Sequence, residues 1–334
     1  MSIKRMLAVM CALFMLTVTL FSCRAQAYEE RSFWHMDTPI VIRLYGAGDE
    51  ADGIFANCQR IITEGEAKLS RTMASSEIAR WNASSDGSVP LSEDTLALIA
   101  QACEIAEVTQ GAFDPTVYPF VELWALCDKE QRLPDAAELE ARGELVSYKH
   151  LRMENGMVTK VLSGVQMDLG GIGKGYLMDR VLAYLEGCNL TGALVSFGSN
   201  VGVVGEKADG KPYKIAIKNP YADSGLAGYL SMEHGVLSVS GDYERYVTIG
   251  DTNYHHILDP ATGYPTQNEL HSVAVLCEDG ALADALSTAL MVMGYERAMS
   301  LYASNAYEFE AIFIFDDRAT WTSGLDGCFV TTDK

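Results

Sequence analysis

The chain has 334 residues, of which 49% are hydrophobic and 21% charged, so its composition is that of a globular protein with room for one large domain or two lobes. Its formal net charge is −20 at pH 7, which argues against a nucleic acid as partner, because an acidic surface repels a phosphate backbone. None of its eight cysteines forms a C-x-x-C pair, so no zinc site is suggested.

The N-terminus has the pattern of an export signal. Two basic residues precede an apolar run over residues 6–21, which is short for a membrane span but typical of a signal peptide. The run ends in L-F-S-C at Cys23, which resembles a bacterial lipobox. We therefore expect residues 1–22 to be removed and residues 23–334 to form a single exported domain, lipid-anchored at Cys23 to the cell membrane and facing the periplasm or the cell exterior. An ordinary cleaved signal peptide is the alternative.

The first elements of this domain are a strand and three helices. Residues 31–45 read as one strand with an irregular step before Pro39. Apolar residues at helical spacing predict a helix over residues 54–69. Two more helices are expected to begin after the N-cap residues Ser76 and Ser92.

A stiff connection, a helix and a hairpin follow. Residues 111–124 contain two prolines and read as a rigid connection. Residues 135–142 look helical. Residues 148–166 look like a hairpin that turns at Asn155-Gly156, because this dipeptide suits the positive φ angles of a tight turn.

The most distinctive stretch is V-Q-M-D-L-G-G-I-G-K-G-Y-L-M-D, over residues 165–179. It reads as a strand that ends at Asp168, then a turn with four glycines and Lys174, then a helix that Gly187 stops. A glycine-rich turn before a helix exposes backbone N–H groups, which together with a lysine suit a phosphate. The spacing fits neither G-x-G-x-x-G nor the P-loop. A tight connection with a surface lysine is the alternative.

Strands dominate the second half of the chain. A helix over residues 283–293, closed by Gly294, is followed by another that starts at Glu296. Hairpins outnumber helical crossovers, which predicts an α+β fold: one domain with two intertwined lobes of largely antiparallel sheet, flanked by helices. The residues that read as strands are 192–205, 213–219, 229–250, 254–258, 271–277 and 309–315.

Asp284 and Thr288 form a candidate metal site. They are four residues apart near the start of a predicted helix, so their side chains face the same way. A carboxylate and a hydroxyl are hard oxygen ligands, suited to Mg²⁺ carried with substrate phosphates. The alternative is structural: Asp284 would favour the helix dipole and Thr288 would bond back into its own helix.

His255 and His256 are adjacent on a predicted strand, so at most one of them enters a given site. The stiff segment D-P-A-T-G-Y-P, over residues 259–265, would hold such a histidine in place. A neutral imidazole can act as a general base near pH 7, although a structural histidine is the alternative. Small polar turns at residues 196–200 and 240–244 either face a ligand or simply turn the chain.

Together, five segments resemble the FAD:protein FMN transferases, the ApbE-type flavin transferases, and they occur in the order seen in that family. The resemblance extends from about Phe33 to the C-terminus. It implies a Mg²⁺-dependent phosphoryl transfer in which FAD binds between the lobes, a threonine hydroxyl of a target redox protein attacks the FMN-side phosphorus, and AMP leaves. Hydrolysis of FAD to FMN and AMP, and a lipoprotein that binds FAD without chemistry, are the alternatives. The five segments are residues 111–119, 168–176, 240–245, 255–265 and 284–294.

The resemblance also assigns roles to single residues. Mg²⁺ would be held by Asp284, Thr288 and the backbone carbonyl of Gly171. His256 would be the base or the group that orients the phosphate. The contacts with the flavin and adenosine parts of FAD would come from Met36, Thr72, Ala112, Phe113, Asp114, Asp168, Lys174 and Ile257.

Two positions depart from the family pattern. Thr72 stands where the family often has an aromatic residue, and Gly173 stands where many members have alanine. Both changes concern FAD affinity more than the reaction class. The acceptor is expected to present its threonine in a short D-G-A-T-type motif on a redox protein subunit.

Overall fold

The computed structural model describes residues 28–207, 209–222 and 224–332. The predicted signal peptide and Cys23 lie outside the described residues. Within the part of the chain that is described, none of the helices has the length and apolar character that a membrane span requires.

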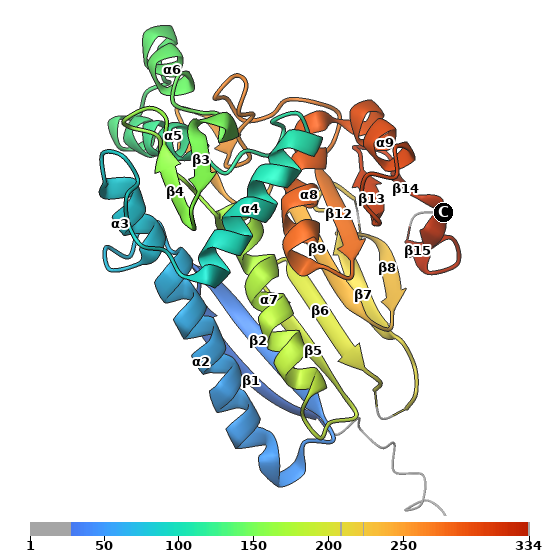
Figure 1. The fold of residues 1–334 in the computed structure, drawn as a ribbon. Helices are drawn as coiled ribbons and strands as arrows, with labels where there is room; N and C mark the ends of the chain where they lie inside the picture. The colour runs from blue at the N-terminus through green and yellow to red at the C-terminus, as the bar shows by residue number, and fades with distance from the viewer. Residues whose placement is uncertain (1–27, 208, 223, 333–334) are drawn as a thin grey trace, which may run out of the picture.

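An eight-stranded sheet forms the centre of the molecule (Figure 1), and every neighbouring pair of its strands is antiparallel. The predicted α+β class is confirmed. The strands in spatial order are β1 (Tyr28–His35), β2 (Thr38–Tyr45), β5 (Gly192–Phe197), β6 (Asn200–Gly205), β9 (Gly235–Gly241), β12 (Ser272–Cys277), β13 (Glu310–Ile314) and β14 (Ala319–Trp321).

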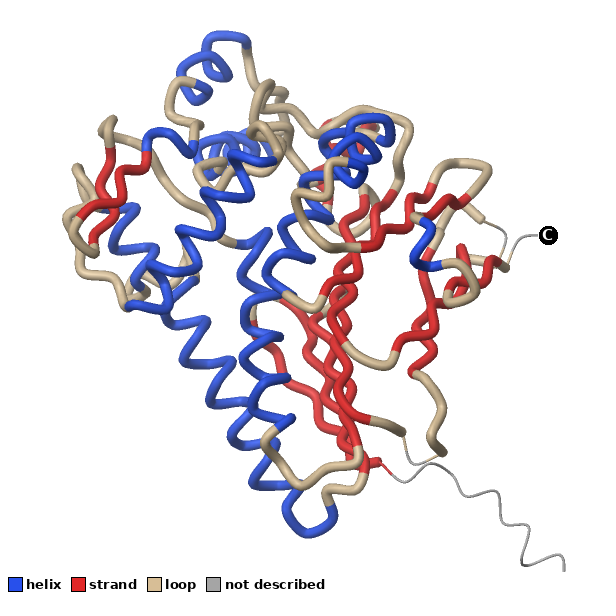
Figure 2. The backbone as a smooth tube through the Cα atoms, turned by 45° about the vertical axis from the view of Figure 1, so that its right-hand side comes forward, coloured by secondary structure: helices blue, strands red, loops and turns tan. Residues whose placement is uncertain are grey.

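Helices cover one face of this sheet and a small sheet covers part of the other (Figure 2). The long helices α2 (Ala51–Leu69) and α7 (Gly170–Glu186) lie along the first face, beside α8 (Gly280–Met293). The remaining helices are α3 (Glu77–Ala83), α4 (Glu93–Val108), α5 (Tyr118–Glu130), α6 (Ala136–Gly143) and α9 (Tyr295–Ala303), with short 3₁₀ turns at Gly48–Glu50, Tyr148–His150 and Ser323–Leu325.

The small sheet is also antiparallel, and two separate hairpins complete the fold. Its strands are, in spatial order, β15 (Phe329–Thr331), β8 (Leu226–Met232) and β7 (Tyr213–Lys218). The hairpins are β3 (Leu151–Glu154) with β4 (Met157–Lys160), and β10 (Tyr246–Ile249) with β11 (Thr252–His255).

Successive side chains of a central strand point to opposite faces of the sheet, and this alternation explains the layers. Val273 and Val275 of β12 point into the core under the helices, whereas Ala274 between them points toward the small sheet. A strand covered on both faces needs apolar residues at almost every position, and β12, with the sequence S-V-A-V-L-C, meets this need. A separate small lobe has its own core around Phe120 and Trp124 of α5, which lies at the top of Figure 1.

The single strand predicted over residues 31–45 is wrong. The irregular step is the turn of a hairpin, because Met36 and Asp37 both have a φ of 53°. A carboxylate from α2 stabilises this turn: Glu66 accepts a hydrogen bond from the Met36 backbone N–H (2.8 Å) and contacts the Nδ1 atom of His35 (2.7 Å). The turn thus depends on a residue 30 positions away, and its own sequence lacks the usual glycine or asparagine signal.

The strand and glycine turn predicted before α7 are also wrong. Residues 165–168 are not part of any sheet, and α7 already begins at Gly170, so the glycines lie within the first turns of the helix. The reason is helix packing: a Cβ atom on Gly175 would lie 1.9 Å from the carbonyl oxygen of Gly280 on α8. Glycine lets the two helices approach closely.

Three further elements differ from the prediction in their extent. The supposed rigid connection ends in the first turn of α5, where Pro119 fits because the first helical N–H groups need no partner. Residues 192–205 are a hairpin that turns at Gly198 (φ 62°). Residues 229–250 break into three strands, with one turn at Gly235 (φ 90°).

Candidate active site

All of the predicted site residues line one cavity of about 580 Å³. The cavity lies between the central sheet with its helices and the small lobe, which contributes Val117, Val121 and Leu258 to its lining. The segments that reach it include the β1–β2 turn, the loop after α2, the loop before α5, the starts of α7 and α8, and the loop after β9. The tertiary fold therefore brings these distant segments together.

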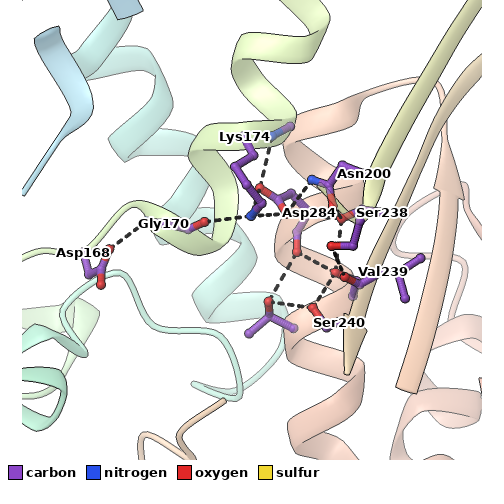
Figure 3. Close-up of polar contacts among 12 residues, drawn as sticks. Asp168, Gly170, Lys174, Asn200, Ser238, Val239, Ser240 and Asp284 are labelled. Carbon is purple, nitrogen blue, oxygen red and sulfur yellow. Dashed lines mark hydrogen bonds and ion pairs between the residues drawn. The ribbon is translucent and has the colours of Figure 1, made fainter. Parts of the chain in front are cut away.

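One side of the cavity comes from α7 and α8, and we call it the helix wall. It consists of Gly170, Gly171, Lys174, Asp284 and Thr288. Figure 3 labels three of these residues: Gly170, Lys174 and Asp284. Only 3% of Asp284 is exposed. The Nζ atom of Lys174 lies 3.1 Å and 3.3 Å from its two carboxylate oxygens. The remaining donors to this carboxylate are the backbone N–H of Gly175 (3.1 Å), the amide of Asn200 (2.9 Å) and the hydroxyl of Ser238 (3.2 Å).

This network shows that the Asp284 side chain does more than favour the dipole of α8. A buried carboxylate is tolerated only when it is paired and hydrogen-bonded, and every donor here comes from another element. Thr288 does bond back into its own helix, to the Asp284 carbonyl oxygen at 3.4 Å, and it also lies 3.2 Å from the hydroxyl of Ser240. The bond back into its own helix, which was the structural alternative for Thr288, is therefore present, but the Thr288 hydroxyl also contacts Ser240.

The oxygen atoms of this wall suit a small, hard cation. The ammonium of Lys174 lies among the Gly170 carbonyl oxygen (3.1 Å) and both Asp284 oxygens. The Gly171 backbone is close to Thr288, because a Cβ atom on Gly171 would lie 3.6 Å from the threonine hydroxyl. Within residues 28–207, 209–222 and 224–332, no three His, Cys, Asp or Glu side chains cluster as a metal site, so a cation here would need hydroxyl, carbonyl and phosphate oxygens beside the Asp284 carboxylate.

Asp168 lies on the floor of the cavity beside a cation that the sequence interpretation missed. Its Oδ2 atom forms a 2.7 Å ion pair with Nε of Arg71, and its Oδ1 atom accepts the Gly170 N–H at 2.8 Å. The guanidinium of Arg71 also lies over the ring of Tyr118, 5.4 Å from its centre. Nothing in the sequence singled out Arg71 beyond its place next to Thr72, an exposed residue that also lines the cavity.

Asp114 is turned into its own loop. Its carboxylate accepts hydrogen bonds from the backbone and hydroxyl of Thr116 (2.8 Å and 2.6 Å) and from the Tyr148 N–H (2.8 Å). Burial raises the pKa of this carboxyl, and the hydrogen bonds oppose the rise. These bonds hold the loop that presents Ala112 and Phe113 to the cavity, so the carboxylate of Asp114 has mainly a supporting function.

The other side of the cavity is the loop wall, as we call residues 240–245 with His256 and Ile257. All of these residues line the cavity except Gly241 and Asp242, which lie in the same segment without reaching it. His256 follows the last residue of β11, so the two histidines are not both on a strand as predicted. His255 does not line the cavity, and its Nε2 atom lies 2.9 Å from the Thr266 carbonyl oxygen. Only His256 enters the site, as the sequence prediction required.

The hydrogen bond of His256 determines its tautomer. Its Nδ1 atom lies 3.1 Å from the Arg245 carbonyl oxygen, and since a carbonyl can only accept, Nδ1 must carry the proton. In the neutral ring Nε2 is then a free acceptor. Desolvation by the surrounding walls lowers the pKa of His256 to about 4, and the charges of Arg245 and Lys174 lower it too, while the bond to the carbonyl opposes this.

The segment after His256 is held rigidly, as predicted. Asp259 donates its N–H to the Tyr264 carbonyl (2.8 Å) and accepts the Gly263 N–H (2.8 Å). Trp124 of α5 donates its indole N–H to the Gly263 carbonyl at 2.7 Å. This turn fixes Ile257 at the cavity wall.

Both small polar turns singled out in the sequence reach the cavity. Ser199 lines it from the β5–β6 turn, and Glu244 and Arg245 line it from the loop after β9. Desolvation raises the pKa of Glu244, although the nearby hydroxyl of Ser199 and the charges of Lys174, Arg245 and Lys218 oppose the rise. Sequence reasoning assigned no role to Glu244, Arg245 or Lys218, because nothing in a lone sequence relates them to Lys174.

Comparisons with known proteins show what the whole chain resembles. The model of the ApbE family matches residues 36–313. The chain is 33% identical to an FAD:protein FMN transferase of Vibrio cholerae, over 77% of this chain and 78% of the relative. It is also 33% identical to an FAD:protein FMN transferase of Klebsiella pneumoniae, over 85% of this chain and 88% of the relative. The crystal structure of the ApbE protein from Thermotoga maritima superposes with a TM-score of 0.83 at 30% identity, covering 90% of this chain and 99% of that one. The flavin transferase ApbE from Vibrio cholerae superposes with a TM-score of 0.78 at 28% identity, covering 91% and 100%.

Proposed function

The chain belongs to the ApbE family, and from this premise we propose that it transfers FMN from FAD to a threonine hydroxyl of a target redox protein, in a Mg²⁺-dependent reaction that releases AMP. The observation that carries the proposal is the cavity itself. It gathers an oxygen-rich cation site at Asp284 and an imidazole with a free acceptor nitrogen at His256. A transfer at a pyrophosphate needs both a cation and a group that receives the proton of the nucleophile.

The reaction forms one bond and breaks one. The threonine oxygen bonds to the FMN-side phosphorus, and the bond from that phosphorus to the bridging oxygen breaks. AMP leaves with the bridging oxygen, and the hydroxyl proton passes to Nε2 of His256. The bond from Nδ1 to the Arg245 carbonyl keeps Nε2 unprotonated before the step.

Asp284, Thr288 and the carbonyl of Gly171 would hold the magnesium ion. When bound, Mg²⁺ neutralises and polarises the pyrophosphate. Lys174 already occupies the cation position beside Asp284, so its ammonium would move toward a phosphate oxygen of the substrate. Met36, Phe113 and Ile257 would contact the rings of FAD, with Thr72, Ala112, Asp114 and Asp168 completing the FAD site.

The low pKa of His256 fits this role once the substrate is counted. In the free protein the imidazole is neutral near pH 7, since its pKa is lowered to about 4. The negative charges of a bound pyrophosphate favour the protonated ring and raise this pKa, so the ring becomes a better proton acceptor when the substrate is present.

We also propose that residues 23–334 act as one domain, anchored outside the cytoplasmic membrane by a lipid on Cys23. The support is the basic and apolar N-terminal pattern that ends in L-F-S-C. A Cys23→Ser variant should lose the membrane fraction in cells, and unchanged membrane association would refute the anchor.

A mass measurement tests the transferase proposal. The chain starting at Cys23 is incubated with FAD, Mg²⁺ and a threonine-bearing acceptor fragment, and the acceptor mass and released AMP are measured. We expect an acceptor heavier by one FMN, and no change with EDTA or with alanine in place of the acceptor threonine. AMP release from an unmodified acceptor would instead indicate an FAD pyrophosphatase. FAD binding without either product would indicate an FAD carrier.

A further inference from the structure

A histidine outside the cavity bridges two carboxylates. The Nδ1 atom of His271 lies 2.6 Å from Oδ2 of Asp242, and its Nε2 atom lies 2.6 Å from Oδ1 of Asp316. Tyr221 stacks on the imidazole, with ring centres 4.1 Å apart, and donates its hydroxyl to Oδ1 of Asp242 at 3.1 Å. None of these four residues lines the cavity.

This geometry requires a charged ring. Carboxylates only accept hydrogen bonds, so two carboxylates at 2.6 Å need a proton on each ring nitrogen. The side chain of Asp316 is 88% exposed to solvent. His271 is thus an imidazolium in this arrangement. Partial burial lowers the pKa of His271, but the hydrogen bonds and charges of Asp242 and Asp316 outweigh it and the net pKa is raised.

The cluster holds the start of the loop wall. Asp242 is the first residue after β9, and it also donates its backbone N–H to the His271 carbonyl at 3.0 Å. Three residues later, the Arg245 carbonyl accepts both the backbone N–H (3.0 Å) and Nδ1 (3.1 Å) of His256. The Arg245 guanidinium crosses to the β1–β2 turn and donates to the Asp37 carbonyl at 3.0 Å.

We propose that the His271 imidazolium, bridging Asp242 and Asp316, is a positioning device for the loop wall that fixes the Arg245 carbonyl and, through it, the tautomer and orientation of His256. A neutral His271 can donate to only one carboxylate. Asp242 and Asp316 are then no longer held together through one ring, so the anchor of the loop wall loosens and His256 becomes less well aligned. The proposal rests on the proposed function where it predicts rates, and on geometry alone where it predicts the state of His256.

The bridge that His271 forms is present at low pH and lost at high pH. Because the pKa of His271 is raised, the bridge is present below that pKa and is lost as the pH rises through it. In the described part of the chain, two phenols lie near Asp242, those of Tyr221 and Tyr243, and burial raises the pKa of both, so neither ionises before His271. We expect kcat to fall about tenfold on the alkaline side while KM for FAD changes little, because small misalignment of a catalytic group affects the chemical step.

The test compares two exposed aspartates that are adjacent in sequence. Asp316→Asn removes one carboxylate from His271, so the pKa of His271 should fall and the alkaline limb of kcat should move to lower pH by about one unit. Asp317→Asn makes the same charge change, but Asp317 pairs with Arg318, and the limb should stay in place. In His271→Arg, the guanidinium can donate to both carboxylates at all pH values, so the alkaline limb of kcat should be absent. A limb that is unmoved by Asp316→Asn, or moved equally by both variants, would overturn the proposal.

A second readout does not depend on activity. The six histidines of the chain give ring ¹⁵N signals that can be titrated, and His271→Arg and His256→Ala assign two of them by loss. The His256 ring signals should shift at the pH at which His271 titrates. Their failure to do so would overturn the positioning role even if flavin transfer is found. Absence of FMN transfer and AMP release at every pH would refute the proposed function, and the His256 signals would still show whether His271 positions His256.

Discussion

The two walls of the cavity are stabilised in different ways. In the helix wall, α7 and α8 touch at Gly175 and Gly280, and the Asp284 carboxylate is 3% exposed among hydrogen-bond donors. In the loop wall, Arg245 and His256 are exposed to the cavity, and the outer anchor includes a carboxylate that is 88% exposed.

This difference indicates how each wall responds to change. A buried, fully bonded carboxylate cannot lose a partner without leaving another polar group unsatisfied, so the helix wall is rigid and sensitive to mutation. Exposed charge pairs contribute little stability and depend on protonation, so the loop wall can change with pH while the fold persists. We expect substitutions in the helix wall to affect both metal binding and folding, and those in the loop wall to affect mainly the rate.

The largest effect is expected in the helix wall. Asp284→Ala should abolish FMN transfer, with AMP release falling at least about 100-fold, because the proposed magnesium site would lose its carboxylate. The free energy of unfolding should also fall by about 1–3 kcal/mol, since buried donors lose their acceptor. Steady-state AMP release and denaturant unfolding measure the two quantities.

The matched control for this variant is Asp279→Ala on the same helix. Asp279 caps α8 through the Leu282 N–H at 2.8 Å and does not line the cavity. The Asp279→Ala substitution should lower the free energy of unfolding by about 1 kcal/mol and leave FMN transfer intact. Full residual transfer by Asp284→Ala would refute the metal assignment.

A smaller effect on rate alone is expected in the loop wall. His256→Ala should slow transfer about 100-fold, as general bases contribute at least this factor, while FAD still binds. The wild-type kcat/KM should fall as the pH drops through about 4, because the imidazole is then protonated and cannot accept a proton, and the variant should lack this limb. Stopped assays across pH and FAD fluorescence titration measure these effects.

His255→Gln provides the comparison. This neighbour contacts the Thr266 carbonyl and lies outside the cavity, so the rate should be close to that of the wild type. Equal losses for both histidine variants, or an unchanged rate for His256→Ala, would remove His256 from the mechanism.

The smallest effect concerns the packing of the helix wall. Gly175→Ala places a Cβ atom 1.9 Å from the Gly280 oxygen and should lower the free energy of unfolding by about 1–3 kcal/mol, although alanine favours a helix. Gly173→Ala meets its nearest neighbours, in Leu69 and Met36, at 3.6 Å and should change stability by less than about 1 kcal/mol, in the stabilising direction. Similar unfolding midpoints for the two variants would show that the close contact between α7 and α8 at Gly175 does not determine stability.

The sequence predicted those elements whose signals are local. The apolar spacing of α2, the Asn155-Gly156 turn and the N-cap at Ser76, which accepts the Ala79 N–H, are all present. The site residues were found as a set because a family resemblance joined segments that no local pattern relates. The Met36-Asp37 turn and the helical state of the α7 glycines were missed, because Glu66 and Gly280 impose them from elsewhere in the chain.

By itself, then, the sequence determined the helical and strand periods, the largely antiparallel character of the sheets and the types of residue available for chemistry. The tertiary structure decided which of them meet: Asn200 reaches Asp284 across 84 residues and Arg71 reaches Asp168 across 97. It also decided that His256, and not His255, enters the cavity with Nε2 free. The physical reason is the separation along the chain over which each influence acts. Backbone preferences act over a few residues, whereas the partners of a buried charge or a catalytic ring are brought together only by packing.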